Sequence, residues 1–160
     1  SKSVFPGLRL GYMVAPENLI QQARALRHLI LRHPPGHAQR TLAYFMALGH
    51  YDAQIRRLRR HLAQRRRVLQ NAIDAEGLFS HSAAHFGGTS FWVSGPDWLD
   101  SRILAKEAIK DGVLIEAGDA FFDDTAPPLN YFRLAYSAIS TERIPEGVAR
   151  LALVMRALRP

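Results

Sequence analysis

The stretch SKSVFPGLRLGYMVAP, residues 1–16, contains two cationic side chains and two glycines. Gly7 and Gly11 flank Arg9, and Lys2 precedes them. A neutral lysine amine forms an imine with an aldehyde, and a guanidinium holds a phosphate through two parallel hydrogen bonds. Flanking glycines let backbone amides approach the same anion. The stretch therefore suits a ligand with an aldehyde and a phosphate, such as pyridoxal 5′-phosphate, although spacing alone favours ordinary surface residues.

Outward from this stretch, hydrophobic periodicity and turn residues predict helices alternating with short strands. The expected strands cover residues 8–15, 89–95, 113–118 and 131–137, and the expected helices cover residues 17–33, 37–48, 52–75, 101–110 and 141–158. In the longest helix, one apolar stripe is expected to be buried: Ile55, Leu58, Leu62, Leu69 and Ile73. This order is typical of an α/β chain with an α+β layout, in which helices, including one long bridging helix, cover a small sheet.

The composition favours a globular domain and excludes several kinds of site. The 160 residues are 48% hydrophobic, which is enough for a core in one domain. No cysteine is present, which excludes disulfides, thiolate catalysis and cysteine-based zinc sites. The histidines have no acidic partner at metal-site spacing, so no metal site is expected. No apolar run approaches the ~18 residues of a membrane span, and no signal-peptide core is present, so a cytoplasmic protein is expected.

Almost all of the positive charge lies on one segment. Residues 51–70 carry seven arginines and a single acid, Asp52, and so supply +6 of the formal net charge of +7. Such a run can face nucleic acid or lipid phosphates. We favour a solvated helix face, because Leu58 and Leu62 of the same segment belong to the apolar stripe and no nucleic-acid motif accompanies the arginines.

Another arginine lies inside an apolar strand. In NYFRLAYS, residues 130–137, strand alternation places Phe132, Leu134 and Tyr136 on one face and Arg133 on the other. An arginine in such surroundings needs an anion or a hydrogen-bonded partner. A substrate carboxylate would satisfy it. The strand alone favours the alternative of a structural salt bridge or of an arginine on an exposed face.

The stretch IEAGDAFF, residues 115–122, joins a predicted strand to a glycine-containing turn and two aromatic residues. Loops that follow strands commonly carry binding residues, so this one can line a pocket. Core packing of Phe121 and Phe122 is the simpler expectation.

Taken together, these segments resemble the fold-type I aminotransferases, which depend on pyridoxal 5′-phosphate. The stretch SKSVFPGLRLGYMVAP resembles their cofactor-lysine segment. It is followed by GHYDAQIRRLRRHLAQRRRVL, GGTSFWVSGP, GVLIEAGDAFF and NYFRLAYSAISTERIPEGVARLA. That order is similar to the MocR subgroup of GntR-family bacterial transcriptional regulators, in which an aminotransferase-like domain follows a winged helix-turn-helix.

The resemblance implies roles for three residues. Lys2 matches the lysine that bonds to the cofactor and, in an active enzyme, moves the proton between Cα and C4′ as a general base. Arg9 matches the arginine that binds the cofactor phosphate, and Arg133 matches the arginine that binds the substrate α-carboxylate. Ala117 departs from the proline that the family has before Gly118, which leaves the shape of that turn open.

The resemblance also implies a division of the chain. Residues 1–50 match the end of the aminotransferase large domain, and residues 51–160 match the bridging helix and the small C-terminal domain. In the family, a glycine-rich phosphate turn, a ring-stacking aromatic residue and the aspartate paired with the ring nitrogen all precede the lysine. The chain is therefore expected to be a fragment that holds the cofactor weakly and lacks a DNA-reading domain.

Two functions follow for the parent protein, which is the longer protein of which this chain is expected to be a fragment. The first is a bacterial transcriptional regulator whose aminotransferase-like domain senses pyridoxal phosphate or an amino compound. The alternative is an active aminotransferase that acts on an amino acid, because Lys2, Arg9 and Arg133 are all present. The chain itself can also be a stable fragment without activity. The resemblance further implies a homodimer, a small amino-acid or amine ligand, and DNA bound only through a separate N-terminal domain.

Overall fold

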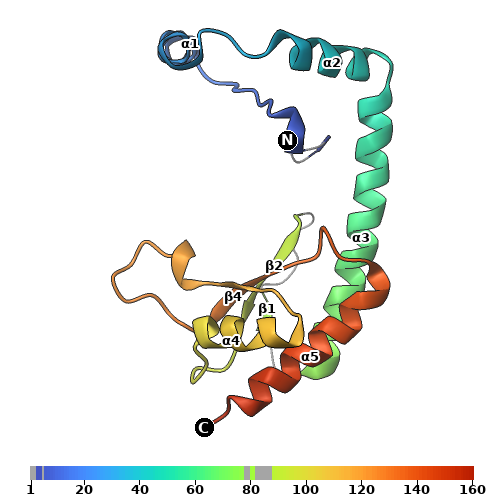
Figure 1. Ribbon diagram of the computed structural model, residues 1–160, viewed down its shortest axis with the longest axis vertical. Helices are drawn as coiled ribbons and strands as arrows, with labels where there is room; N and C mark the ends of the chain where they lie inside the picture. The colour runs from blue at the N-terminus through green and yellow to red at the C-terminus, as the bar shows by residue number, and fades with distance from the viewer. Residues whose placement is uncertain (1–2, 5, 78–79, 82–87) are drawn as a thin grey trace. The chain divides into compact units, whose positions relative to one another are not determined.

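The computed structural model describes residues 3–4, 6–77, 80–81 and 88–160. The chain divides into two compact units, Ser1–Arg59 and Arg60–Pro160, which are described separately (Figure 1). Helix α3, His50–Glu76, begins in the first unit and ends in the second. The expected division into large-domain and small-domain parts after residue 50 stays a prediction.

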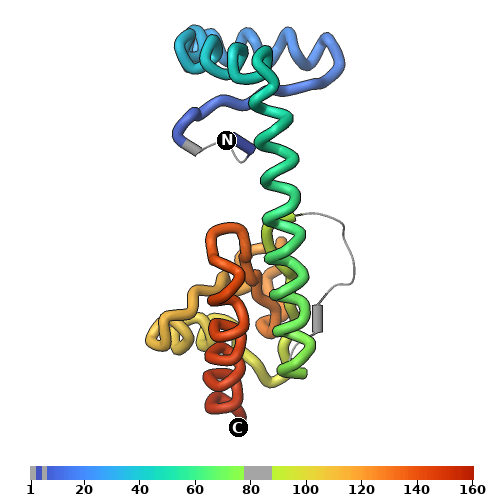
Figure 2. Tube along the Cα trace, turned by 90° about the vertical axis from the view of Figure 1, so that its right-hand side faces the viewer, coloured from blue at the N-terminus to red at the C-terminus, as the bar shows by residue number. Residues whose placement is uncertain are grey.

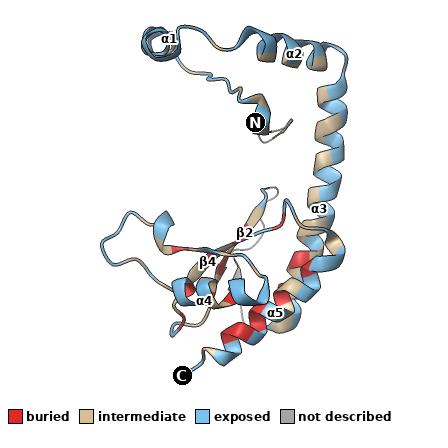
Figure 3. Cartoon of the chain, in the orientation of Figure 1, coloured by how far each residue is buried: buried red, intermediate tan, exposed pale blue. Residues whose placement is uncertain are grey.

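The first unit consists of helices without a core of their own. After η1, Pro6–Leu8, come α1, Glu17–Leu31, and α2, Gly36–Ala47. None of the described residues of this unit is buried, as Figure 3 shows. Large apolar side chains of both helices are exposed: Leu19, Leu26, Leu29, Ile30, Leu31, Tyr44 and Met46. Within this chain, the first unit therefore lacks the apolar packing that stabilises most helices in proteins.

Proline and glycine mark the helix ends of this unit, as the sequence predicts. Pro16 and Pro35 immediately precede α1 and α2, and Gly49 follows α2 at φ +75°, a left-handed conformation that favours glycine. The expectation of a strand over residues 8–15 is wrong, because residues 9–16 form no strand. A strand needs a hydrogen-bonded neighbour, and the sheet in the described part of the chain is built from residues 80–135.

The second half of α3 packs into the core of the second unit. Leu69 and Ile73, one turn apart, are 3% and 0% exposed. Ile55 and Leu58, from the same predicted stripe, are only half-buried. Gly77, at φ +63°, follows the end of the helix. The stripe is thus buried only where the second unit supplies an apolar surface against it.

The described part of the second unit contains a four-stranded antiparallel sheet with the strand order β1-β2-β4-β3. Its strands are β1, Ser80–His81, β2, Ser90–Ser94, β3, Glu116–Ala117, and β4, Tyr131–Ala135. The predicted strands over residues 89–95 and 131–137 are confirmed. Strand β3 is shorter than the predicted residues 113–118, and β1 was not predicted because two residues carry no periodic pattern.

The core lies on one face of this sheet. Alternate residues of its two central strands, Phe91 and Val93 of β2 with Phe132 and Leu134 of β4, are at most 8% exposed. They form one apolar cluster with side chains of α3, α4 and α5. The alternation predicted for residues 131–136 is therefore confirmed, and Arg133 lies on the opposite face.

Helices α4, Ser101–Ala108, and α5, Ile144–Ala157, close the core together with α3. Three short 3₁₀ helices lie in the connections: η2, Ile109–Asp111, η3, Asp119–Phe121, and η4, Thr141–Arg143. As predicted, Asp100 caps α4 by accepting a hydrogen bond from the backbone N–H of Arg102 at 2.9 Å. Helix α5 lies beside the second half of α3 (Figure 2), where Arg156 pairs with Glu76 at 2.8 Å. The result is the α+β layout that the sequence predicts.

Candidate functional site

Three side chains form a row across the open face of the sheet. Antiparallel register places Trp92 of β2 and Glu116 of β3 directly opposite Arg133 of β4. Residues directly opposite one another in an antiparallel pair carry side chains on the same face. The strand pairing therefore brings one acid, one base and one large aromatic ring together on the face away from the core.

The guanidinium of Arg133 has two neighbours within this face. Its Nη2 donates a hydrogen bond to Glu116 Oε1 at 2.5 Å, and its central carbon lies 5.3 Å from the ring centre of Phe121. Its Nε is buried and has no hydrogen-bond partner among the described residues. The need for an anionic partner, inferred from the strand, is thus met by Glu116, while part of the donor capacity of Arg133 stays unused.

Four aromatic residues form the aromatic group: Trp92 of the row itself, with Phe121, Phe122 and Tyr131 beside it. The Trp92 ring stacks on Tyr131 at 5.8 Å and meets Phe121 edge-on at 5.6 Å. Phe122 lies 5.8 Å from Trp92 and 5.7 Å from Tyr131. The expectation that Phe121 packs in the core is wrong: its side chain is 52% exposed and contacts the opposite face of the sheet. The group gives Arg133 an apolar, partly open surrounding.

Gly118 holds the turn after β3 against β4. Its N–H donates to the carbonyl of Tyr131 at 2.9 Å. A Cβ on Gly118 would lie 2.4 Å from that same oxygen, so the close approach of the two backbones requires glycine. Ala117, where the family has proline, pairs with Phe132 in β3. The turn is therefore ordered with alanine at this position, and it places Phe121 beside Arg133.

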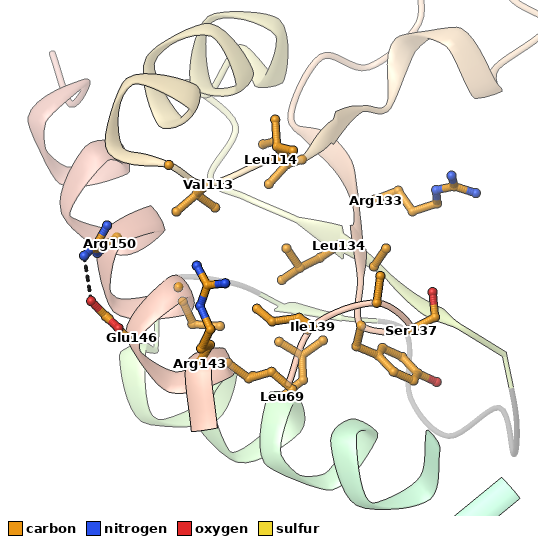
Figure 4. Close-up of a pocket in the computed structure, with 18 of the residues that line it drawn as sticks. Leu69, Val113, Leu114, Arg133, Leu134, Ser137, Ile139, Arg143, Glu146 and Arg150 are labelled. Carbon is orange, nitrogen blue, oxygen red and sulfur yellow. Dashed lines mark hydrogen bonds and ion pairs between the residues drawn. The ribbon is translucent and has the colours of Figure 1, made fainter. Parts of the chain in front are cut away.

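A cavity of about 480 Å³ lies next to this row. Leu69, Leu134 and Ile139 contribute to its apolar wall, and Arg133 and Glu116 belong to its rim. Figure 4 shows the guanidinium of Arg133 directed away from Leu134 and Ile139. The row and the apolar wall therefore lie on different faces of β4.

The N-terminal stretch belongs to the first unit. Lys2 lies outside the described residues, so its predicted role stays a prediction. Arg9 is exposed at φ +49°, in the left-handed region that non-glycine residues seldom adopt, and a Cβ on Gly11 would meet no atom within 4 Å. An exposed guanidinium beside open backbone fits a phosphate ligand. Arg133 belongs to the second unit, so the two arginines are described separately.

The arginine-rich segment of α3 has two kinds of side chain. Arg65 and Arg66 are half-buried: Arg65 Nη1 donates to the carbonyl of Ser137 at 2.6 Å, and Arg66 lies over the Phe91 ring at 5.4 Å. The other arginines of the segment are exposed: Arg56, Arg57, Arg59, Arg60 and Arg67. The exposed set agrees with the solvated helix face that we favoured.

Two other kinds of site are absent from the part of the chain that the structure describes. No group of three or more His, Asp or Glu side chains in the described ranges is arranged to hold a metal ion. Within the same ranges, no helix combines the length and the apolar character needed to cross a membrane.

Comparison with known proteins decides the family. The model of the family "Aminotransferase class I and II" matches residues 1–151. The chain belongs to this family. Its small sheet, the covering helices and the long α3 are thus those of a fold-type I aminotransferase, as the resemblance predicted.

Among curated members, the HTH-type transcriptional regulator TauR of Rhodobacter capsulatus is 50% identical over 156 residues. The match covers 98% of this chain and 32% of that protein. The transcriptional regulator YdfD of Bacillus subtilis is 27% identical over 160 residues, covering 99% of this chain and 32% of that protein. The chain therefore spans about a third of the length of these relatives.

Solved structures of family enzymes agree with this fold. The α-aminoadipate aminotransferase LysN of Thermus thermophilus, solved with N-(5′-phosphopyridoxyl)-L-leucine, matches with a TM-score of 0.90 at 26% identity. That match covers 99% of this chain and 40% of the LysN chain. Pyrococcus horikoshii kynurenine aminotransferase, solved with PMP, matches with a TM-score of 0.88 at 26% identity, covering 100% and 40% of the chains. Pyridoxal phosphate is thus the cofactor of the intact family.

The sequence did not identify Glu116 or the aromatic group as neighbours of Arg133. The signal that could have found Glu116 is the antiparallel pairing of its segment with residues 131–135, since directly opposite residues interact. Trp92 could have been found in the same way. No motif spacing contains this information, because the three segments are separated by loops.

Proposed function

We propose that the chain is part of the aminotransferase-like domain of a bacterial transcriptional regulator that senses pyridoxal phosphate or a small amino compound. The observation that carries this proposal is the 50% identity with the regulator TauR, against 24% to 28% for the aminotransferases among the curated relatives. A separate N-terminal domain of the longer protein would bind DNA. The parent would be a cytoplasmic homodimer, as is usual for this fold.

When bound, pyridoxal phosphate supplies an aldehyde for amines and a ring that withdraws electrons from the attached carbon. In our proposal Lys2 bonds to that aldehyde and Arg9 binds the phosphate. Arg133 then holds the carboxylate of the amino compound through its guanidinium fork. The exposure of Arg9 and of part of the Arg133 side chain supports these assignments. The isolated chain is expected to bind the cofactor weakly, because this chain spans only a third of its relatives' length.

The alternative function is an active aminotransferase, which the presence of Lys2, Arg9 and Arg133 together allows. In that case the Lys2 amine would also carry the proton to and from the substrate Cα as a general base. A regulator needs Lys2 for sensing only, whereas an enzyme needs it for turnover.

The deciding experiment uses the full-length protein with the DNA upstream of its own gene. Fluorescence anisotropy measures DNA affinity with and without pyridoxal phosphate and amino compounds, and a coupled assay measures the 2-oxo acid formed. A ligand-dependent change in DNA affinity without sustained 2-oxo acid formation is expected. Sustained turnover with DNA affinity unaffected would favour the enzyme instead.

Variants then test each residue. Lys2→Ala should abolish borohydride-trapped cofactor in peptide mass spectra, and an unchanged adduct would refute the lysine assignment. Arg9→Gln should weaken the cofactor, and Arg133→Gln should weaken carboxylate ligands more than the cofactor. Loss of the cofactor alone in Arg133→Gln would show that the two arginines have been exchanged.

A further inference from the structure

Glu116 is the anionic partner of Arg133 on the open face of the sheet. The two residues are directly opposite each other in the β3–β4 pair, and their side chains are joined by the 2.5 Å hydrogen bond. Because antiparallel register fixes this position, the Glu116 carboxylate stays within reach of the guanidinium whether or not a ligand is bound. Any anion that binds Arg133 therefore does so beside a negative charge.

The ion pair is easily opened. The side chains of Arg133 and Glu116 are 40% and 51% exposed, so water screens their attraction and the pair adds little to the stability of the fold. The buried Nε of Arg133 has no partner in the described part of the chain. Buried donors that serve only a structural bridge are normally satisfied. An incoming carboxylate can therefore open the exposed pair, and the unpaired Nε shows that Glu116 does not use every donor of the guanidinium.

We propose that Glu116 is a specificity-determining residue that favours ligands with one negative group over ligands with two. The inference rests on the proposed function, in which Arg133 binds the ligand carboxylate. One ligand carboxylate uses the positive charge of Arg133. Glu116 then repels a second anionic group on the same ligand. The aromatic group beside Arg133 offers apolar surface to an uncharged side chain instead.

The test compares two probes that differ only at the end of the side chain. They are N-(5′-phosphopyridoxyl)-L-norleucine and N-(5′-phosphopyridoxyl)-L-2-aminoadipate, which end in a methyl group and a carboxylate respectively. Both carry the same phosphate and ring, so both report binding without turnover. Isothermal titration calorimetry on the full-length protein, freed of cofactor, measures the two dissociation constants.

The wild-type protein is expected to bind the norleucine probe at least about fivefold more tightly than the aminoadipate probe. Glu116→Gln should reduce this preference, chiefly by tighter binding of the aminoadipate probe. Glutamine retains a hydrogen-bond acceptor for Arg133, so the urea unfolding midpoint of the Glu116→Gln variant should match that of the wild-type protein. Glu107→Gln is the matched control, since it removes the acid of another exposed pair, with Lys110 at 2.7 Å, and should keep the preference.

Equal affinity of the wild-type protein for the two probes would overturn the inference, as would an unchanged preference in Glu116→Gln. Arg133→Gln distinguishes this failure from a failure of the proposed function. If that variant binds both probes as tightly as the wild type, the role proposed for Arg133 is wrong. If it binds both weakly while Glu116→Gln behaves as the wild type, only the role of Glu116 is wrong.

Discussion

The two units of the chain differ in where their apolar side chains lie. The second unit buries them in a single cluster between a sheet and three helices. The first unit forms helices of good length, but none of its described residues is buried. Helix signals in the sequence are therefore sufficient to predict where α1 and α2 lie in the chain, but they do not show what packs against the apolar side chains of these helices. Apolar helical surface of this extent is normally covered in a complete protein.

Amide hydrogen exchange on the 160-residue chain should show the largest difference between the units. Amides in β4 and α5 are expected to exchange at least ~1,000-fold more slowly, relative to their intrinsic rates, than amides in α1 and α2. The reason is that only the second unit must unfold a core to expose them. Mass spectrometry of peptides from each unit measures the effect, and similar protection in both would contradict the comparison.

A matched pair of isoleucines tests the same difference by substitution. Ile73 is 0% exposed and Ile30 is 76% exposed. Ile73→Ala should lower the free energy of unfolding by about 2–5 kcal/mol through lost burial and a cavity, whereas Ile30→Ala should change it by less than about 0.5 kcal/mol. Urea unfolding followed by tryptophan fluorescence provides the measurement, since Trp92 and Trp98 both lie in the second unit.

A pair of glycines sharpens the comparison at the level of backbone packing. Gly118→Ala places a Cβ 2.4 Å from the Tyr131 carbonyl oxygen and should cost about 1–3 kcal/mol. Gly11→Ala meets no atom within 4 Å and should be close to neutral. Thermal unfolding by circular dichroism distinguishes the two variants. A neutral Gly118→Ala would mean that the β3 turn can move away from β4.

The smallest expected effect concerns the cap of α4. Asp100→Ala should cost about 1 kcal/mol near neutral pH through loss of the N-cap. The hydrogen bond from the Arg102 side chain is the largest cause that holds the pKa of Asp100 below 3.8. The stability that the ionised carboxylate of Asp100 contributes is therefore present above pH 3.8 and is lost as pH falls through the lowered pKa. Asp100→Asn can still cap the helix and should lose only the pH-dependent part of this stability. If the free energy of unfolding of this variant kept the wild-type pH profile, the ionised Asp100 would not be the cause.

The alternation of β4 could be predicted because it depends on neighbouring residues alone. Phe132 and Leu134 are apolar and Arg133 is not, so the strand shows which face is buried. The strand expected over residues 8–15 failed for the opposite reason. Its local pattern is favourable, but a strand also requires a partner, and the pattern contains no information about one.

The candidate site could be predicted only in part. The sequence singled out Arg133 and its need for an anion, and the structure supplies the anion as Glu116. Which acid this is depends on how β3 is aligned with β4, a relation between distant segments. The sequence does not place Phe121 because an aromatic residue in the turn after a short strand suits either face of a sheet, and the turn at Gly118 decides between them.

The row of Trp92, Arg133 and Glu116 also determines where the length of the chain can vary. Strand side chains alternate, so one inserted residue within Tyr131–Ala135 would move Arg133 to the core face and an apolar neighbour to the open one. An insertion among the exposed residues 123–126 leaves the strand pairing intact. The row is therefore compatible with a longer or shorter loop there, while the strand is fixed residue by residue.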